Sequence, residues 1–420
     1  MRASDRVTAA AGDRLSQDAR AAFAPDTPHR IGVAVSGGGD SMALLHLLGA
    51  VAPWAGWVVE AVTVDHGLRP EAADEALFVA DFCAMHGIPH STLHWHRPEG
   101  AGNLMDQARR ARAQLIADWA RARGIGHVAL GHTADDQAES FLMNLGRAAG
   151  LDGLSAMRLA WTDQGIRWAR PLLGHSRAAL RDYLRAQGIG WIDDPSNENP
   201  RFTRVKARRA LQALAPLGIT AESIAASARN LTAARDALVL ATAQAAEVCV
   251  TEQDGALRLD PARFFALPDE LRRRLLLAAL LWFGGADYPP RATQVARLGL
   301  ALAEGRAATL AGLRFRPQGD ALLIQREPRA VMPPVASTDL WDHRWRLHGP
   351  HAPDLRIGAL GAGGLAACPD WRATGLGHET LLATPAIWQG QRLIAAPLAG
   401  KGAEWQATLS PSFGMFILSH

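Results

Sequence analysis

Short apolar runs alternate with longer segments of helical periodicity through the first half of the chain. The runs have the length of buried strands, and the segments between them carry apolar residues three and four positions apart, as amphipathic helices do. The predicted strands cover residues 31–35, 57–64, 90–95 and 128–130. The predicted helices cover residues 41–48, 71–86, 103–123 and 134–145. This alternation predicts an α/β fold, with a parallel doubly wound sheet covered by helices on both faces.

Two clusters of turn-forming residues divide the rest of the chain, at residues 193–200 and 326–334. Helical periodicity follows the first cluster, at residues 202–214, 222–248, 271–282 and 291–304. The last stretch is rich in glycine and carries short strand-like runs at residues 344–347 and 392–396. We therefore expect three domains: an α/β domain at 1–210, a mainly helical domain at 211–330 and a small β-rich module at 331–420.

The composition excludes a disordered chain and one kind of nucleotide-binding loop. With 420 residues, 48% of them hydrophobic, the chain has enough apolar material for large cores, which excludes a wholly disordered protein. The 44 basic residues nearly balance the 41 acidic ones, so a basic surface must come from local clustering. Lys206 and Lys401 are the only lysines, and neither follows a glycine-rich loop. A Walker-type phosphate loop, which needs such a lysine, is therefore excluded.

The cysteines and the apolar runs predict in which cellular compartment the protein is located. Cys83, Cys249 and Cys368 lie far apart, which disfavours a disulfide framework and a cysteine-rich metal site. The first 30 residues lack the apolar core of a signal peptide. The longest apolar run, 275–286, has 12 residues, against about 20 that cross a bilayer. We expect a cytoplasmic protein that does not bind a membrane.

A glycine-rich loop joins the first predicted strand to the next helix, and its residues are Ser36, Gly37, Gly38, Gly39, Asp40 and Ser41. The glycines let backbone N–H groups approach a phosphate, and the helix N-terminus adds partial positive charge. A carboxylate in such a loop would repel phosphate unless a divalent cation lies between them, so Asp40 is a candidate Mg²⁺ ligand. The alternative is a plain strand–helix turn capped by Asp40.

This loop resembles the SGGxDS loop of the PP-loop ATP pyrophosphatases, which split ATP between its α- and β-phosphates. Three further segments resemble the tRNA(Ile)-lysidine synthase family within that superfamily: residues 64–69, residues 131–139, and residues 194–197 with the arginine run that follows. The resemblance covers most of residues 30–211. It implies an adenine nucleotide alpha hydrolase-like fold for a catalytic first domain, with ATP as a substrate bound by residues 36–41 and Mg²⁺ as a cofactor. It also implies that the helical domain binds tRNA.

Two polar clusters follow predicted strands, at the sheet edge where parallel sheets bind ligands. Asp65 and His66 end the second strand, and the resemblance places them near the nucleotide. Beyond the fourth strand, Asp136 and Glu139 are three positions apart and share a helical face. Such a pair suits the ammonium group of lysine, or accepts its proton.

The same segment has an ordinary structural alternative. Thr133 is a good helix N-cap, and acidic residues are favoured in a first helical turn. Together with the glycine loop the site interpretation is the stronger one. The resemblance then assigns His132, Asp136 and Glu139 to the catalytic site.

Two groups of arginines are candidates for phosphate or RNA contacts. Arg109 and Arg112 match the spacing of a helix whose arginines, in the family, are thought to meet ATP or tRNA; we assign Arg109 to catalysis and Arg112 to tRNA. A basic run then follows the turn cluster, comprising Arg201, Arg204, Lys206, Arg208 and Arg209. Arginine suits phosphates and unpaired bases, so we expect a tRNA track; the alternative is a solvated basic helix face.

The resemblance implies one reaction in two steps. The C2 oxygen of the wobble cytidine in the CAU anticodon of tRNA(Ile) attacks the α-phosphate of ATP, and free L-lysine then displaces AMP to give lysidine. Two alternatives stay open: another PP-loop enzyme that adenylates tRNA, or a nucleotide- or RNA-binding module without turnover. A tRNA thiolase would normally show paired cysteines. The sequence leaves open the oligomeric state, a homodimer included, the tRNA features read, the carboxylate that deprotonates lysine and the role of the C-terminal module.

Overall fold

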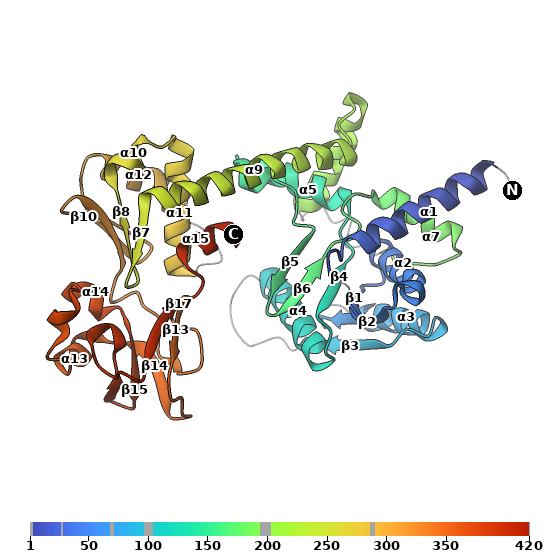
Figure 1. Cartoon of the computed structure of the whole chain (residues 1–420). Helices are drawn as coiled ribbons and strands as arrows, with labels where there is room; N and C mark the ends of the chain where they lie inside the picture. Colours follow the sequence, from blue (N-terminus) through green and yellow to red (C-terminus); the bar gives the residue numbers. More distant parts are fainter. Residues whose placement is uncertain are drawn as a thin grey trace. The chain divides into compact units, whose positions relative to one another are not determined.

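The computed structural model describes residues 3–26, 28–67, 71–95, 104–193, 203–285 and 290–419, without the side chains of residues 3–11 and 104–106. Its contacts divide the chain into two compact units, residues 1–235 and residues 236–420. The first unit is built on a mostly parallel sheet, and the second is built on antiparallel sheets (Figure 1). The α/β fold class predicted from the sequence is confirmed.

The sheet of the first unit has six strands in the order β3-β2-β1-β4-β6-β5. Their bounds are β1 (Arg30–Ala34), β2 (Val58–Asp65), β3 (His90–His94), β4 (His127–Leu130), β5 (Ala160–Asp163) and β6 (Ile166–Ala169). All neighbours pair in parallel except the edge hairpin of β5 and β6. The order reverses direction between β1 and β4, and such a switch point is where doubly wound sheets bind ligands at their carboxyl ends.

Helices cover both faces of this sheet (Figure 1). The helices of this part of the chain are α1 (Ala3–Ala21), α2 (Gly39–Ala55), α3 (Glu71–Met85), α4 (Leu104–Ala122), α5 (Ala134–Leu145), α6 (Leu151–Leu154), α7 (Arg177–Ala186), α8 (Thr203–Leu214) and α9 (Ala221–Cys249), the last of which continues into the second unit. Ile31 and Val33 belong to a core shared with α1, α2, α3 and α7, whereas Ala34 belongs to the core under α4. Successive side chains of β1 therefore point into two different cores, one on each face of the sheet.

Gly32 of β1 allows α4 to pack closely on its face of the sheet. A Cβ atom at this position would lie 2.8 Å from the ring of Trp119. A larger side chain would therefore push α4 away from the sheet. This helix carries Arg109 and Arg112, so the glycine also sets where those arginines lie.

The second unit contains a five-stranded antiparallel sheet in the order β7-β8-β11-β10-β9. The strands are β7 (Val250–Gln253), β8 (Ala256–Leu259), β9 (Ala308–Leu310), β10 (Leu313–Gln318) and β11 (Ala321–Arg326). The helices of this region are α10 (Pro261–Ala266), α11 (Asp269–Gly284) and α12 (Ala292–Ala303). They share one apolar core with the sheet, which includes Phe283, Leu313 and Phe315.

This sheet was not predicted from the sequence, and its strands lie among the longer helices of residues 211–330. Its strands have three to six residues, and most of them mix apolar with polar positions, as LRFRPQ does in β10, so they lack the continuous apolar run typical of a buried parallel strand. The division into two units also falls within α9, because this helix of 29 residues continues unbroken across position 235. The boundaries of the three expected domains stay a prediction, and the turn cluster at 194–200 lies outside the described residues.

The remaining elements form a small β-rich module, as expected for residues 331–420. Its strands are β12 (Val335–Ala336), β13 (Trp345–His348), β14 (Leu355–Ala359), β15 (Pro385–Gln389), β16 (Arg392–Ala395) and β17 (Gln406–Leu409). Its helices are α13 (Gly361–Ala366) and α14 (His378–Leu382), whereas the last helix, α15 (Phe413–Ser419), packs into the core of the five-stranded sheet. Trp341 and Trp345 lie in its core, which accounts for two of the tryptophans of this stretch.

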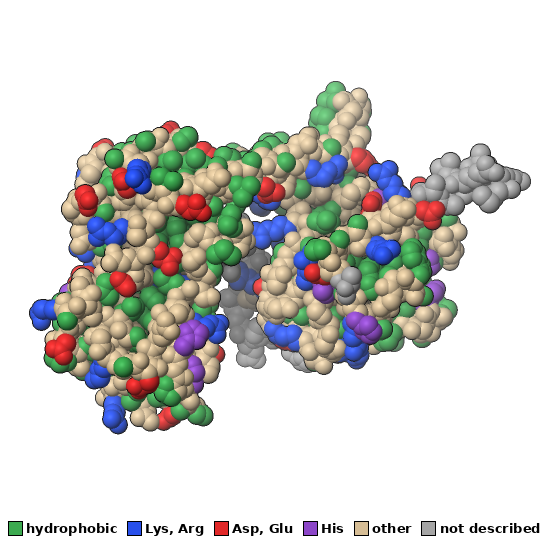
Figure 2. All heavy atoms as spheres, viewed as in Figure 1, with side chains coloured by type: hydrophobic (Ala, Val, Ile, Leu, Met, Phe, Trp, Pro, Cys, Tyr) green, Lys and Arg blue, Asp and Glu red, His purple; other side chains and the backbone are tan. Residues whose placement is uncertain are grey.

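Two surface properties concern binding partners. On the face drawn in Figure 2, basic and acidic side chains are interspersed over each unit, in keeping with the small net charge. Among the helices of the described part of the chain, none combines the length and apolar character needed to cross a bilayer.

Candidate active site

The glycine-rich loop follows β1 and leads into α2, at the carboxyl edge of the sheet. Gly37 has a φ of +82°, a conformation that favours glycine. The N–H of Ser36 donates to Oγ of Ser41 over 3.1 Å, and that hydroxyl donates to the Gly38 carbonyl over 2.9 Å. Gly38 caps α2 without a side-chain hydrogen bond, so backbone N–H groups at the helix start remain for an anion.

Gly131, just after β4, brings the second polar cluster against this loop. A Cβ atom on Gly131 would lie 3.0 Å from Cα of Ser41, so a side chain there would push the backbone of the glycine loop away. Because Gly131 precedes His132, the close approach sets the start of α5 beside the start of α2. Sequence analysis included Gly131 in a motif but did not predict this packing role.

Asp40 is held on one side and left open on the other. Its Oδ2 accepts a hydrogen bond from Nε of Arg177 over 3.0 Å. Its Oδ1 is buried and has no hydrogen-bond partner. Burial raises the pKa of this carboxyl, and Arg177 opposes that rise. A buried carboxylate oxygen without a partner is unusual, and it is the donor type that a hard cation prefers.

At the start of α5, Asp136 both takes part in the helix cap and faces Arg177 of the site. Thr133 caps the helix, and Oδ2 of Asp136 accepts from both the N–H and the hydroxyl of Thr133 over 2.9 Å. The other oxygen, Oδ1, lies 3.6 Å from Nη2 of Arg177. Asp136 is therefore a capping residue that also turns one oxygen toward the cluster.

Glu139, one turn further along α5, is completely buried. Its Oε1 accepts from Nε of Arg208 over 2.6 Å and from Nη1 of Arg177 over 3.4 Å. Its Oε2 has no hydrogen-bond partner. The carboxylate face expected to meet a lysine ammonium thus meets two arginines of this chain.

His132 faces Arg170, which follows β6 at the same edge of the sheet. Nε of Arg170 donates to Nδ1 of His132 over 3.3 Å, so the ring proton of the neutral imidazole lies on Nε2. Burial and the charge of Arg170 lower the pKa of His132 to about 4. Arg170 itself is fixed by the ring of Trp161, 4.1 Å from its guanidinium carbon, and by the carbonyl of Arg158.

The residues predicted on β2 and α4 lie around the same centre. Oδ1 of Asp65 accepts from the N–H of Gly67 over 2.8 Å, which shapes the turn after β2. Burial lowers the pKa of His66, and the positive charge of Arg112 lowers it further. Arg112 acts in the same direction on His132. Burial lowers the pKa of Arg170 to about 10, and the positive charge of Arg109 acts in the same direction.

The basic run on α8 divides into two kinds of residue. Arg204, Lys206 and Arg209 are exposed, as a tRNA-binding surface requires. Arg208 instead points toward α5, where it binds Glu139. Arg201 lies outside the described residues. The structure therefore separates Arg208 from the exposed cations with which the sequence grouped it.

Sequence reasoning missed Arg170 and Arg177. Arg170 directly follows β6, a strand that was not predicted, so its position at the ligand edge could not be inferred. Arg177 is the first residue of α7, after the N-cap Ser176. A Ser followed by a helical pattern was the available signal for that helix start, but no spacing rule relates it to Asp40.

The described residues contain no group of three or more His, Cys, Asp or Glu side chains that could hold a metal by themselves. Mg²⁺ usually takes one or two carboxylates and completes its shell with phosphate oxygens and water. The single open oxygen of Asp40, beside a phosphate-binding loop, fits that requirement.

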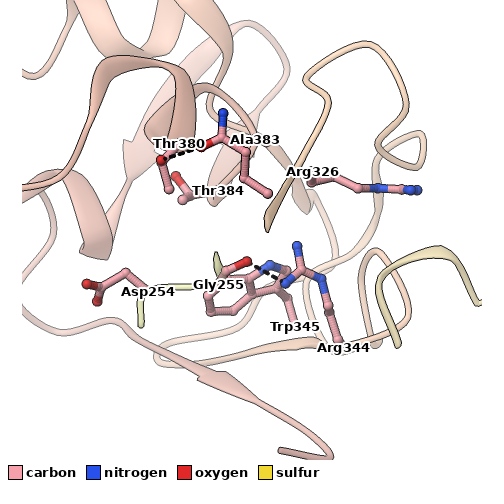
Figure 3. A pocket seen from close by; sticks show the side chains of 9 residues that line it. Asp254, Gly255, Arg326, Arg344, Trp345, Thr380, Ala383 and Thr384 are labelled. Carbon is pink, nitrogen blue, oxygen red and sulfur yellow. Dashed lines mark hydrogen bonds between the residues drawn. The ribbon is translucent and has the colours of Figure 1, made fainter. Parts of the chain in front are cut away.

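A small cavity in the second unit is unrelated to these residues (Figure 3). Its volume of about 10 Å³ suits one water molecule. Arg344 donates to the carbonyl of Gly255 over 2.8 Å at its wall, and Thr380 donates to Gln325 over 3.1 Å. Burial lowers the pKa of Arg344 to about 9. None of the predicted site residues lines this cavity.

Comparisons with known proteins agree with the geometry. Residues 13–214 match the family model described as a PP-loop domain. The tRNA(Ile)-lysidine synthase of Ruegeria pomeroyi is 49% identical over 96% of this chain and 97% of its own length. The corresponding enzymes of Zymomonas mobilis and Hyphomonas neptunium are 41% and 39% identical, over 67% and 74% of this chain and 84% and 85% of their own. The similarity thus extends beyond the PP-loop domain into the second unit.

Proposed function

The chain belongs to the tRNA(Ile)-lysidine synthase family of ATP-using ligases that form lysidine on tRNA(Ile), and we propose that it joins free L-lysine to C2 of the wobble cytidine of the CAU anticodon. The reaction consumes ATP and yields AMP and pyrophosphate. The observation that carries this proposal is the convergence of Asp40, His132, Asp136 and Glu139 at one edge of the sheet.

In the first step the C2 oxygen of cytidine forms a bond to the α-phosphorus of ATP. The bond between the α-phosphorus and the bridging oxygen to the β-phosphate breaks, and pyrophosphate leaves. Backbone N–H groups at the start of α2 receive the departing phosphates, because Gly38 provides no competing side-chain cap. Asp40, whose Oδ1 has no partner, would hold Mg²⁺, and the ion would supply charge neutralisation for the phosphates.

In the second step the lysine amine forms a bond to C2 and AMP leaves with the C2 oxygen. The incoming ammonium must lose a proton before it is a nucleophile. Asp136 and Glu139 supply negative charge for this ammonium. Oδ2 of Asp136 is engaged by Thr133 and Oε1 of Glu139 by Arg208, so Oδ1 and Oε2 are the oxygens proposed to meet the amine. His132, which is neutral at physiological pH because its pKa is about 4, presents Nε2–H as a donor to the reacting cytidine or phosphate.

The open carboxylate oxygens of the site support a cationic second substrate. Asp136 and Glu139 face the guanidinium groups of Arg177 and Arg208, which balance their charge, so the support comes from the oxygens that these contacts leave open. Buried carboxylates bind cations strongly when an oxygen is left without a partner, and Oε2 of Glu139 is such an oxygen. A neutral or anionic nucleophile would gain nothing from this arrangement.

Exposed cations on α8 are proposed to contact the tRNA backbone. Arg204, Lys206 and Arg209 project from a helix that packs on α5, the helix carrying Asp136 and Glu139. Arg112, a partly exposed residue of α4, and Arg201, which lies outside the described residues, are proposed from the sequence to contact the tRNA as well. Anticodon bases are unpaired, so they reach the site without melting a helix.

The cysteines argue against a sulfur-transfer enzyme as the alternative within the superfamily. All three are buried and free, and burial raises the pKa of Cys83 to about 11. A protonated, buried thiol is a poor nucleophile.

Pyrophosphate exchange into ATP tests the first step. The chain is incubated with ATP, Mg²⁺, labelled pyrophosphate and tRNA(Ile) bearing CAU, without lysine. We expect label in ATP, and none when the wobble cytidine is replaced by uridine. ATP that binds without any exchange or splitting, whichever RNA and amine are supplied, would establish the non-catalytic alternative instead.

A further inference from the structure

A single arginine, Arg177, contacts all three carboxylates of the cluster formed by Asp40, Asp136 and Glu139. Its guanidinium reaches Asp40 at 3.0 Å, Glu139 at 3.4 Å and Asp136 at 3.6 Å, through three different nitrogen atoms. Its backbone N–H donates to Oδ2 of Asp135 over 2.7 Å. Arg177 therefore joins the start of α2, the start of α5 and the start of α7.

The three contacts of Arg177 depend on the planar shape of its guanidinium, which lysine lacks. A guanidinium is a planar fork with five N–H donors, so it can hold several carboxylates in a fixed relation, whereas an ammonium is a compact point charge. At Arg177 the three contacts occupy Nε, Nη1 and Nη2, one carboxylate each. The contacts leave Oδ1 of Asp40 and Oε2 of Glu139 without partners.

The fold does not depend on Arg177 for the packing of α7. Leu180 and Leu184 of α7 are fully buried in the core of the first unit, and α7 packs on α2 through this side. The side chain of Arg177 is 21% exposed and reaches away from that core into the carboxylate cluster. Its contacts are thus with site residues, while the helix is held by its apolar face.

We propose that Arg177 is a positioning residue of the ligase, which acts by aligning Asp40 with Asp136 and Glu139. This inference rests on the proposed function, because the three carboxylates are the groups assigned there to the metal and to lysine. Arg177 touches neither substrate in this account. It keeps three mutually repelling carboxylates at fixed separations and directs their open oxygens toward the substrates.

Two substitutions separate this role from a structural one. Arg177→Gln removes the charge, and Arg177→Lys keeps the charge but removes the fork. A misplacement of about 1 Å in a catalytic group costs roughly 100-fold in rate, so we expect Arg177→Gln to lower kcat for lysidine formation by about that factor. Arg177→Lys should recover part of the loss. The KM for tRNA should change by less than about twofold in both, because the exposed cations of α8 are untouched.

Arg185→Gln is the matched control. Arg185 lies on the same helix, is 61% exposed and pairs with Asp182 three positions away. Its replacement should leave kcat unchanged. Circular dichroism and a thermal melt of all three variants establish that each is folded. If Arg177→Gln does not fold, the kcat of Arg177→Lys tests the proposal instead.

A double-mutant cycle supplies the second readout. If Arg177 acts through Glu139, the combination of Arg177→Gln with Glu139→Gln costs little more than the slower single variant, whereas Arg185→Gln adds to Glu139→Gln without coupling. Turnover of Arg177→Gln or Arg177→Lys equal to the wild type, or strict additivity with Glu139→Gln, overturns the inference. Lysidine formation by the wild type tests the proposed function. The ratios of variant to wild-type kcat test the role of Arg177, so failure of the one can be told from failure of the other.

Discussion

Nε of Arg177 donates to Oδ2 of Asp40 over 3.0 Å, although 137 positions separate the two residues. One begins α7 and the other lies in the first turn of α2, and these helices pack against each other. The sheet order brings both helix starts to the carboxyl edge, where β1 and β4 diverge. The pair therefore links the phosphate-binding loop to the carboxylates of α5.

Replacement of Asp40 tests the metal assignment. Asp40→Asn keeps the shape and removes the charge, so the open oxygen becomes a much weaker Mg²⁺ ligand. We expect pyrophosphate exchange to fall at least 100-fold, with an unchanged circular dichroism spectrum. Arg177 retains Asp136 and Glu139 as partners, which preserves the local fold. Near-normal exchange at ordinary Mg²⁺ concentrations would show that Asp40 is not the metal ligand.

His132 makes a pH-dependent contribution to stability. Its pKa is about 4 in the folded chain against the ordinary value of 6.5, so between these values the unfolded chain binds a proton that the folded chain does not. The contribution of His132 to the free energy of unfolding is therefore complete above pH 6.5 and is lost as the pH falls toward 4. We expect the thermal midpoint of the wild type to fall more steeply over this range than that of His132→Asn. Parallel curves would contradict the assignment.

Salt dependence of tRNA binding tests the α8 surface. Removal of one cation that binds a phosphate should reduce the slope of log K against log salt by roughly 0.7 to 0.9. Arg204→Ala with Arg209→Ala should therefore weaken tRNA binding and flatten the slope, while ATP binding stays the same. Arg208→Ala is the informative comparison, because Arg208 pairs with Glu139 and should affect turnover more than tRNA affinity. An unchanged slope in the double variant would make these arginines an ordinary solvated face.

A buried ionic cluster in the second unit gives a stability prediction. Asp342 is completely buried, and its Oδ1 accepts from Arg326 over 3.1 Å and from the N–H of Met332 over 3.2 Å. Arg344, also buried, lies 3.9 Å from Oδ2. Removal of one partner from such a cluster costs about 3–5 kcal/mol. Asp342→Asn should lower the free energy of unfolding by that amount in a denaturant titration, and the exposed control Asp339→Asn should not.

Asparagine is the appropriate replacement at this position because the backbone of Asp342 has a φ of +47°, which asparagine tolerates well. The decrease in stability then reports the missing charge rather than backbone strain. Equal stability of Asp342→Asn and the wild type would mean that the cluster does not need its negative charge.

Sequence patterns predicted much of the first unit because its central strands are continuous apolar runs that alternate with helices of clear periodicity. The predicted helix at 134–145 and the strand at 128–130 agree with α5 and β4 almost to the residue. The five-stranded sheet of the second unit was missed because most of its strands mix apolar with polar residues, as VTEQ does in β7 and LRFRPQ in β10. The hairpin of β5 and β6 was missed for the same reason, and Arg170 with it.

The residues of the candidate site were easier to find than their contacts. The glycine loop and the pair Asp136 and Glu139 each follow a strand, so a sheet edge could be inferred. The pairing of Glu139 with Arg208 and Arg177 depends on how α7 and α8 pack on α5 and α2, which no local pattern encodes. That packing is why an expected surface cation proved to be a partner of a buried carboxylate.

Attachment of lysine to the tRNA is the most direct test of the proposed function. The chain is incubated with labelled free lysine, ATP, Mg²⁺ and tRNA(Ile) bearing CAU, and the digested nucleosides are analysed by mass spectrometry. We predict labelled lysidine at the wobble position, with one AMP and one pyrophosphate formed for each lysine attached. Ammonia, glutamine and sulfide should not replace lysine, because the open carboxylate oxygen of Glu139, one helical turn from Asp136, suits a long cationic amine. Use of one of those donors while lysine is ignored would contradict the proposed reaction, even if ATP is split.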